Sequence, residues 1–378
     1  MSCNMAYNCP VDTAEDVFLS VVVPCFNEVD TIAESVAMVL KLGEQLKLEL
    51  IIVDDCSTDG SSEIVSSIAA AHDNIVAVYH DRNRGKGAAL RTGFKIAKGE
   101  YVAVHDADLE YDPFDLLRLL EPLKSGKADV AFGSRYLHQE QRRVLYFWHS
   151  LMNKALTFLS NIFTDLDLTD METCYKVFRR EVIQGIEIEE DRFGFEPEIV
   201  AKVAQKRVPV YELGVSYAPR TYSEGKKINW RDGVRAIYCI FHYNAHIAPV
   251  PLQFLIYFFI GAFSAVCNIL LFAAISTGVD NIVFGAALAN FMAAAVNYWL
   301  CVKILFKHRA HWNTWAEICI YLLVVMASGA LDAGATLLLV NLGYSRIVSK
   351  SIACVITFVA NFIGRRFFVF PEPTLERY

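Results

Sequence analysis

The sequence predicts an α/β domain built on a mostly parallel β-sheet, followed by an all-α domain of four long apolar helices. Two observations carry this prediction. Apolar runs of strand length alternate with helical patterns over the first third of the chain. No charged residue lies between Leu252 and Val279, a stretch longer than the roughly 20 residues that cross a bilayer core. The 378 residues are enough for both domains.

Four β-strands are predicted in the first domain. Phe18–Val23 is an unbroken apolar and β-branched run, as expected for a strand that is covered on both faces. The pattern recurs at Leu48–Val53, Ile75–Tyr79 and Tyr101–His105, and a helical pattern over Asp30–Lys47 separates the first two strands. Strand, crossover helix, strand is the arrangement of doubly wound sheets, which bind ligands beyond the carboxyl ends of their strands.

Two amphipathic segments follow this sheet, at residues 142–163 and 230–248. Each carries aromatic and aliphatic residues along one helical face, with Arg or Lys beside them. Such a pattern is typical of helices that lie in a membrane interface. A helix that packs its apolar face on the sheet would show the same pattern. The sequence therefore leaves both interpretations open.

The apolar half is predicted to span the membrane four times. The expected helices cover 252–276, 282–306, 315–341 and 347–368. Basic residues gather on one side, with Lys303, Lys307 and Arg309 after the second helix and Arg365-Arg366 at the end of the fourth. Because positive charge marks cytoplasmic segments, we expect the first domain and the C-terminus in the cytoplasm. The N-terminal segment lacks a basic start followed by an apolar run, so no signal peptide is predicted.

These patterns give the expected division of the chain. The first domain occupies residues 18–229 and contains the amphipathic segment at about 142–163. The amphipathic helix 230–248 leads into a membrane domain at 249–370. Residues 1–17 and 371–378 are expected to be terminal tails.

The membrane half also contains a short sequence pattern that occurs twice. Asn297-Tyr298 leads to Lys303 and Phe306, and Asn361-Phe362 leads to Arg365, Arg366 and Phe370. In both places an Asn precedes an aromatic residue, then a basic residue, then a Phe. Two helix hairpins related by duplication would explain this, as is common in membrane proteins.

Composition excludes several other classes of protein. The ten cysteines are scattered and form no CxxC pair, so we expect reduced thiols and neither a zinc site nor a disulfide framework. The net charge of −7 and the lack of a basic stripe with interleaved aromatic residues argue against a nucleic-acid partner.

Three acidic residues follow the fourth predicted strand at alternate positions, namely Asp106, Asp108 and Glu110. Residues i, i+2 and i+4 of an extended segment face the same way, so the three side chains can converge. Their oxygens suit a hard cation, Mg²⁺ or Mn²⁺, which would also hold a diphosphate. A solvated acidic loop is the alternative, but the preceding apolar strand and Pro113 favour a metal site.

Polar residues also follow the first two strands. Glu28 and Asp55 could accept hydrogen bonds from the ring N–H groups of a nucleobase or from ribose hydroxyls. Helix capping by Asn27 or Asp55 is the simpler alternative. Residues 83–87, Asn-Arg-Gly-Lys-Gly, form a glycine-rich turn before a helix, which can approach a phosphate closely.

Six motifs occur in one order along the first domain: PCFNE, VDDCSTDGS, NRGKG, HDADLE, GSRY and RTYSEGKKI. With this set, Leu19–Gly233 resembles the family 2 glycosyltransferases of the GT-A fold, a Rossmann-like sheet. It is more closely similar to the polyprenyl-phosphate group typified by dolichyl-phosphate mannose synthase. The tail resembles the four-helix GtrA-type membrane domain that accompanies such enzymes.

The resemblance implies a nucleotide-sugar site. Its expected residues are Pro24, Phe26, Glu28, Val53, Asp55, His105, Asp106, Ala107, Asp108, Arg135, Lys176, Arg220 and Lys226. Of these, we expect Asp106, Asp108, Arg135, Arg220 and Lys226 to take part in catalysis. The metal would be held by Asp106, Asp108 and Glu110, although the family often has Gln at the third position. A planar guanidinium such as that of Arg220 suits phosphate oxygens.

The expected acceptor determines the expected chemistry. A lipid monophosphate, with a second pKa near ~6 by analogy with phosphoserine, is largely ionised at pH 7 and needs no general base. We therefore expect inverting transfer of mannose or glucose from GDP-mannose or UDP-glucose to polyprenyl or dolichyl phosphate at the cytoplasmic membrane face. Asp170 and Glu172 are spare carboxylates that could act as a base if the acceptor were a hydroxyl.

Two other functions remain open at this stage. A processive polysaccharide synthase has a similar donor domain and membrane helices, but the chain lacks a QxxRW motif. A protein that both loads and flips a lipid-linked sugar is the second alternative. Asp332, inside the third predicted span, supports it because charge within a span is costly and often functional.

Overall fold

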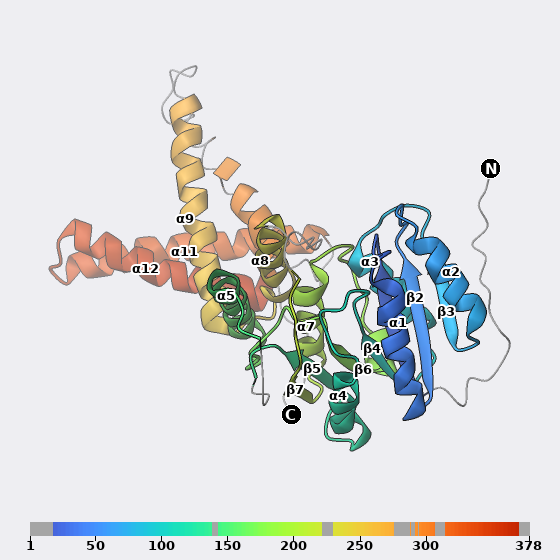
Figure 1. Ribbon diagram of the computed structural model, residues 1–378. Helices are drawn as coiled ribbons and strands as arrows, with labels where there is room; N and C mark the ends of the chain where they lie inside the picture. Colours follow the sequence, from blue (N-terminus) through green and yellow to red (C-terminus); the bar gives the residue numbers. More distant parts are fainter. Residues whose placement is uncertain are drawn as a thin grey trace. The chain divides into compact units, whose positions relative to one another are not determined.

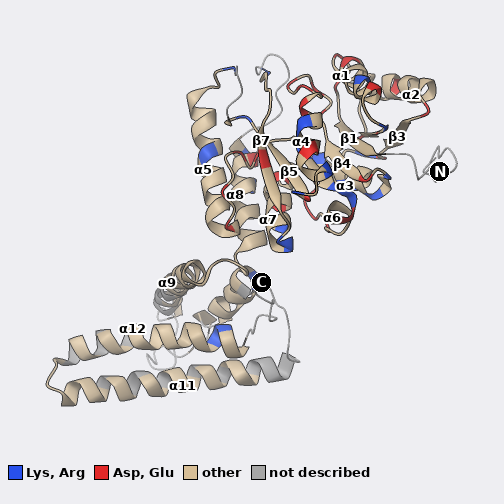
Figure 2. Cartoon of the chain, turned by 90° about the horizontal axis from the view of Figure 1, so that it is seen from below, with Lys and Arg blue, Asp and Glu red and all other residues tan. Residues whose placement is uncertain are grey.

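The computed structural model describes residues 18–137, 143–220, 230–275, 288, 292–293, 295–306 and 314–369. The chain divides into two compact units, Met1–Asn244 and Ala245–Tyr378 (Figure 1). Charged residues are spread over the first unit, whereas the helices of the second are nearly free of them (Figure 2).

The described part of the first unit is built on a seven-stranded sheet with the order β3-β2-β1-β4-β6-β5-β7. Its strands are β1 (Leu19–Cys25), β2 (Leu48–Asp54), β3 (Ile75–Tyr79), β4 (Tyr101–Val104), β5 (Val130–Ser134), β6 (Lys176–Arg179) and β7 (Val210–Gly214). Only β6 runs antiparallel to its neighbours, β4 and β5. The other pairs are parallel, which confirms the predicted mostly parallel sheet.

The predicted strands differ from the observed ones only at their ends. β1 continues past Val23 to Cys25 because Pro24 and Cys25 still pair in register with Val53 and Asp54 of β2. Both strands are buried along almost their whole length, as the unbroken apolar pattern predicts for the centre of a sheet.

Helices connect these strands and cover the sheet. They are α1 (Ile32–Leu40), a 3₁₀ turn η1 (Lys41–Glu44), α2 (Ser61–Ala71), α3 (Lys86–Ile96), α4 (Asp115–Lys124), α6 (Arg180–Gln184) and α7 (Phe195–Lys206). The helix predicted over Asp30–Lys47 thus narrows to a 3₁₀ turn after Leu40, as helix ends commonly do. Since α3 packs on β1 and β2, its first turn lies beside the carboxyl ends of these strands.

The two amphipathic segments form α5 (Phe147–Thr164) and α8 (Trp230–Asn244), which pack on each other and on α7. The rings of Phe163 and Phe241 meet edge to face at 4.9 Å. Each helix also leaves large apolar side chains exposed: Phe147, Trp148, Leu151, Met152, Phe158 and Ile162 on α5, and Trp230, Val234, Ile237 and Tyr238 on α8. Each helix therefore has one packed face and a second, uncovered apolar face.

The second unit is helical. It contains α9 (Val250–Ile275), a helical stretch at 295–300 that continues as the π-helix η3 (Cys301–Phe306), α11 (Thr314–Asn341), α12 (Arg346–Gly364) and the π-helix η4 (Arg365–Val369). Within the described residues, one helical stretch, Val250–Asn268, is long and apolar enough to span a membrane. Ala295–Leu305 and Cys319–Ser328 are shorter apolar stretches. Most of the first half of the span predicted at 282–306 lies outside the described residues.

Candidate active site

The loops after β1, β2 and β4 lie at one edge of the sheet, because these neighbouring strands are parallel. Asn27 after β1 and Cys56 after β2 have left-handed backbones, with φ of 50° and 64°. The Asn27 side-chain oxygen accepts a hydrogen bond from the backbone N–H of Thr58 at 2.8 Å. Such costly conformations persist where the surroundings hold them and cluster at functional sites.

Asp55 holds the glycine-rich turn. Its carboxylate accepts hydrogen bonds from the backbone N–H groups of Arg84 (2.9 Å) and Gly85 (2.6 Å), and it pairs with His80 Nδ1 at 2.7 Å. Gly85 has φ +101°, and a Cβ there would collide with the backbone of Asp191. In this structure Asp55 is thus occupied in positioning the turn that begins α3.

Lys86, the first residue of α3, bridges two acidic residues. Its Nζ lies 2.9 Å from Asp106 and 3.0 Å from Glu196 on α7. Although burial alone would lower the pKa of Lys86, the charge of Asp106 raises it well above the usual value. Burial likewise opposes ionisation of Asp106, but Lys86 holds the pKa of this carboxyl below its usual value.

Arg220 contacts three acidic residues from two loops. Its guanidinium lies 3.0 Å from Glu28 and 2.8 Å from Asp108, and its backbone N–H donates to Glu110 at 2.8 Å. Glu110 also accepts a hydrogen bond from Tyr217 at 3.0 Å. Burial, and then the charges of Asp106 and Glu110, raise the pKa of Asp108 to about 7.

This acidic cluster, defined as Glu28, Asp106, Asp108, Glu110 and Glu196, holds five carboxylates against the two cations Lys86 and Arg220. Its donor chemistry fits a hard divalent cation. Among the described residues, however, no three acidic, His or Cys side chains are arranged to hold a metal ion. Each predicted ligand faces a basic side chain instead, so a metal would have to replace these contacts.

Four other predicted residues shape this edge without offering a free polar side chain. Pro24 and Val53 are paired residues of β1 and β2, and the carbonyl of Ala107 accepts a hydrogen bond from Thr31. The ring of His105 is buried between Ser35 (2.9 Å) and Tyr175 (2.8 Å). Burial lowers the pKa of His105 to about 4, so the imidazole is neutral. Phe26 lies in the loop directly after β1.

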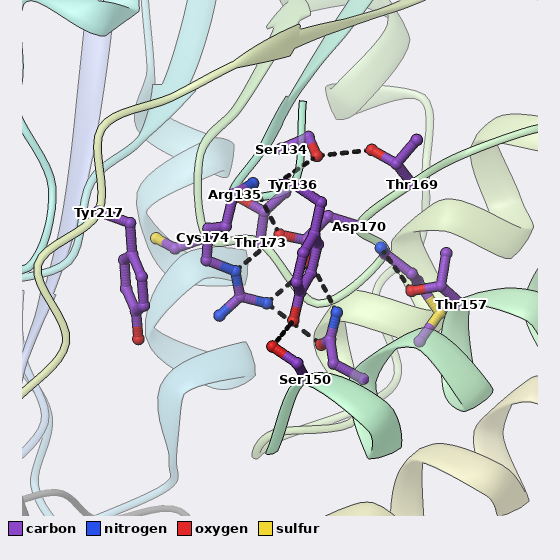
Figure 3. A network of polar contacts seen from close by, with 12 residues as sticks. Ser134, Arg135, Tyr136, Ser150, Thr157, Thr169, Asp170, Thr173, Cys174 and Tyr217 are labelled. Atoms are coloured by element: carbon purple, nitrogen blue, oxygen red, sulfur yellow. Dashed lines mark hydrogen bonds and ion pairs between the residues drawn. The ribbon is translucent and has the colours of Figure 1, made fainter. Parts of the chain in front are cut away.

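Arg135, after β5, forms a separate network with Asp170 (Figure 3). Two guanidinium nitrogens donate to the Asp170 carboxylate at 2.6 and 2.7 Å, and Asn153 of α5 contacts both residues. The guanidinium also lies 5.1 Å from the centre of the Tyr217 ring. Although burial opposes it, Arg135 keeps the pKa of Asp170 below the usual value. We call these residues the Arg135 network.

The two remaining predicted basic residues are Lys176 and Lys226. Lys176 is fully buried, and its Nζ donates to the carbonyls of Met171 (3.0 Å) and Thr173 (2.6 Å). Burial lowers the pKa of this amine below its usual value. Lys226 lies outside the described residues.

Of the two spare carboxylates, Asp170 is fixed by Arg135, and Glu172 is half-buried with a buried Oε1 atom. Within the described part of the chain, its Oε1 has no hydrogen-bond partner. Burial, and then the charge of Glu196, raise the pKa of Glu172 to about 8. Sequence reasoning missed Lys86 and Glu196 as members of the cluster. The NRGKG turn marks Lys86, but no sequence signal marks Glu196, which comes from a distant helix.

Two family models match the chain. Glycosyl transferase family 2 matches residues 20–186, and the GtrA/DPMS transmembrane domain matches residues 256–370. The chain therefore joins a glycosyltransferase domain of the GT-A class to a membrane domain. Its first unit contains a glycosyl transferase family 2 domain and its second a GtrA/DPMS transmembrane domain. The resemblance inferred from the motifs is confirmed, and so is the fold class.

The curated relatives align with the first unit. A dolichol-phosphate mannosyltransferase of Pyrococcus furiosus is 28% identical over 210 residues, which cover 55% of this chain and 58% of that protein. An undecaprenyl-phosphate 4-deoxy-4-formamido-L-arabinose transferase of Aeromonas hydrophila is 30% identical over 211 residues, covering 55% and 62%. The aligned segment thus spans less than two thirds of either relative.

Among solved structures, glucosyl-3-phosphoglycerate synthase from Mycobacterium tuberculosis, in complex with UDP, superposes with a TM-score of 0.49 and 18% identity. The superposition covers 61% of this chain and 80% of that one.

Proposed function

We propose that this protein transfers a hexose, mannose or glucose, from GDP-mannose or UDP-glucose to polyprenyl or dolichyl phosphate. The observation that supports this most is the joining of a family 2 glycosyltransferase domain to a GtrA/DPMS membrane domain in one chain. Two relatives, a dolichol-phosphate and an undecaprenyl-phosphate sugar transferase, point to the same acceptor class.

The donor is proposed to bind across the loops after β1, β2 and β4. Ligands of doubly wound sheets bind beyond the carboxyl ends of the strands. Glu28 lies at this edge, and the backbone around Pro24 and Val53 forms its floor. Asp55 acts indirectly, because it fixes the turn that directs Lys86 toward Asp106.

Asp106 and Asp108 are proposed to hold Mg²⁺ or Mn²⁺, with Glu110 as a third ligand. When bound, the cation would neutralise charge on the departing nucleoside diphosphate. The surplus of carboxylates over basic side chains supports this assignment, since such a cluster gains by adding a cation. Arg220 and Lys86 would then be released from Asp108 and Asp106 to contact phosphate oxygens.

The acceptor phosphate is proposed to attack the anomeric carbon directly. A bond forms between the phosphate oxygen and that carbon, while the bond from the carbon to the diphosphate oxygen breaks with inversion. No proton has to be removed, because the acceptor is already ionised at pH 7. Arg220 would neutralise the approach of one anion to another. Arg135 would act as a positioning residue rather than contact the reacting atoms, since its guanidinium already donates two hydrogen bonds to Asp170.

The first unit is proposed to lie at the cytoplasmic face, with residues 249–370 in the bilayer. The uncovered apolar faces of α5 and α8 support contact with the membrane interface, because aromatic side chains such as Trp148 and Trp230 are favoured there. The basic residues Lys303 and Arg365-Arg366 support the orientation under the positive-inside rule.

The test is a transfer assay with the full-length protein in detergent and one polyprenyl phosphate. GDP-mannose and UDP-glucose are supplied separately, each with Mg²⁺ or Mn²⁺. We expect one donor to give a lipid-linked sugar of inverted anomeric configuration, with release of its nucleoside diphosphate. Transfer only to sugar hydroxyls, or growth of a polymer, would replace this proposal with the processive synthase. In that case Glu172, with its raised pKa, becomes the carboxyl to test as the base.

A further inference from the structure

An arginine is buried inside the membrane unit. Arg365, the first residue of the π-helix η4, is only 6% exposed. Its Nη1 donates to Asn297 Oδ1 at 2.5 Å and to Cys301 Sγ at 3.8 Å, and its Nη2 donates to Tyr321 Oη at 3.2 Å. The guanidinium also lies 5.5 Å from the ring centre of Tyr257 and 4.9 Å from that of Tyr321.

All of these partners are neutral. Among the described side chains, the polar partners of Arg365 include no carboxylate, and its Nε is buried without a hydrogen-bond partner. Aromatic faces and an amide oxygen orient a guanidinium without cancelling its charge. A buried cation in a membrane protein is costly, and it is usually paired or functional. Among the described side chains, this arrangement therefore leaves the charge of Arg365 uncancelled and its Nε–H free as a donor.

The two segments that carry the repeated sequence pattern meet at Arg365. In each segment, a π-helix begins four residues after the repeated Asn: η3 at Cys301 after Asn297, and η4 at Arg365 after Asn361. Arg365 of the second segment donates to Asn297 of the first, whereas the Asn361 Oδ1 is buried without a partner. The repeat thus carries one such arginine, with Cys301 at the equivalent position. Departures from regular helix geometry of this kind often mark functional sites.

An apolar groove adjoins the same segment. It has a volume of about 420 Å³ between α11 and the α12–η4 segment, and its lining includes Ile320, Val324, Leu331, Gly364 and Phe368. Gly364 directly precedes Arg365, and a Cβ there would come within 2.7 Å of a Val324 methyl. Ile320 directly precedes Tyr321, a partner of Arg365. The groove and the Arg365 contacts thus involve neighbouring residues of α11 and of the α12–η4 segment, although Arg365 itself does not line the groove.

We propose that Arg365 binds the phosphate headgroup of a polyprenyl lipid whose isoprenoid chain lies in this groove. The phosphate would accept a hydrogen bond from the free Nε–H and neutralise the charge of the guanidinium. The planar, forked donors of arginine suit phosphate oxygens. The lipid class rests on the proposed function of the chain. The site itself is separate from the acidic cluster, because all of its residues belong to the second unit.

The first experiment measures binding of a radiolabelled polyprenyl phosphate to the full-length protein in phosphatidylcholine nanodiscs. We expect Arg365→Gln to weaken this binding by about tenfold or more, the range of a charge-assisted hydrogen bond, and Arg365→Lys to weaken it less. The matched control is Lys303→Gln, which removes the basic residue of the first repeat, an exposed side chain. Unchanged binding in Arg365→Gln, or equal loss in the control, overturns the proposal.

A second experiment needs no variant. A polyprenyl phosphate carrying a photoreactive group near the phosphate is crosslinked to the wild-type protein. Labelled peptides from the segments around Tyr321 and Arg365 support the proposal, and labelling confined to the first unit overturns it. Inorganic phosphate and phosphatidylglycerol are added as competitors. Displacement by either at the concentration that polyprenyl phosphate requires would make this an unselective anion site and overturn the lipid assignment.

If Arg365→Gln destabilises the protein without changing lipid binding, Arg365 has a structural role only and the proposal fails. Failure of the proposed function has a different signature. Arg365-dependent lipid binding without glycolipid synthesis supports this site alone, and glycolipid synthesis without such binding supports the enzyme alone. Arg220→Ala, in the first unit, should leave binding at Arg365 intact.

Discussion

Two ionic networks in the first unit contrast in their balance of charge. In the Arg135 network, one arginine meets one carboxylate through two parallel hydrogen bonds, and Asp170 is completely buried. In the acidic cluster, Lys86 and Arg220 face five carboxylates, and the side chains are partly exposed. The first network is saturated, whereas the second has spare acceptors and surplus negative charge.

This difference in charge balance indicates that the Arg135 network serves the stability of the fold, whereas the acidic cluster serves catalysis. A buried pair with matched partners gains little from any further ligand, and breaking it leaves an uncompensated charge. A cluster with surplus carboxylates is stabilised when a cation binds, so its residues are not all required for the stability of the fold. We therefore expect substitutions in the Arg135 network to act on the free energy of unfolding, and those in the acidic cluster to act on catalysis.

The largest expected effect is on stability. Asp170→Asn should lower the free energy of unfolding of the first unit by about 3–5 kcal/mol, because it leaves the Arg135 guanidinium buried and unpaired. Chemical denaturation of the purified protein measures this. Asp167→Asn makes the same change at an exposed position nearby and should have little effect. A normal unfolding midpoint in Asp170→Asn would abolish the distinction between the two networks.

The next effect falls on activity. Asp106→Asn and Asp108→Asn should each lower kcat/KM for transfer by about 100- to 1000-fold, since each weakens the hold on the proposed metal and its stabilisation of departing charge. Both proteins should stay folded by the same denaturation test, and EDTA should abolish wild-type activity. Glu63→Gln, an exposed change on α2, is the control. Full activity in EDTA would contradict the metal-dependent mechanism.

A smaller loss is expected from Arg220→Ala. Charge-assisted hydrogen bonds contribute about 1.5–3 kcal/mol each, so kcat/KM on polyprenyl phosphate should fall by about tenfold or more. Arg220→Lys should restore it only in part, because an ammonium cannot make the two-pronged contact. The exposed Arg82→Ala is the control. If hydrolysis of the donor by water falls as much as transfer, Arg220 acts on the diphosphate rather than on the acceptor.

The fold could be predicted because local patterns determine it. Largely apolar runs placed β1 to β4 within two residues of their observed ends, and β1, β2 and β4 are buried along almost their whole length. The later strands β5, β6 and β7 gave no comparable alternation of strand and helix, and the antiparallel insertion of β6 depends on long-range pairing. The π-helices at Cys301 and Arg365 could not be read from an apolar pattern either.

The candidate site could be predicted only in part. Motifs at strand ends identified Asp106, Asp108 and Glu110, because parallel neighbours bring such loops together. Their partners are a different matter. Arg220 lies 112 positions from Asp108 in the sequence. The motif resemblance assigned Lys176 to the phosphates, but in the structure its amine is buried and donates to the carbonyls of Met171 and Thr173. Which basic side chain faces which carboxylate is decided by packing, which the sequence does not display.

The smallest expected effect concerns Glu172, which belongs to neither network and tests what burial does to a carboxyl without a matched partner. Its pKa is raised from 4.5 to about 8, first by burial and then by the charge of Glu196. The folded state therefore binds this proton more tightly than the unfolded state. The resulting stability is fully present below pH 4.5 and is lost as the pH rises through about 8.

Glu172→Gln keeps the shape of the protonated carboxyl and cannot ionise. The variant should thus match the wild type near pH 4 and exceed it in free energy of unfolding by about 1 kcal/mol or more at pH 9, since each pKa unit corresponds to about 1.4 kcal/mol. Denaturation series at both pH values measure the difference, with Glu181→Gln on the exposed side of α6 as the control. Parallel pH dependence in variant and wild type would mean that Glu172 finds a partner that satisfies its charge. It would then join the saturated class together with Asp170.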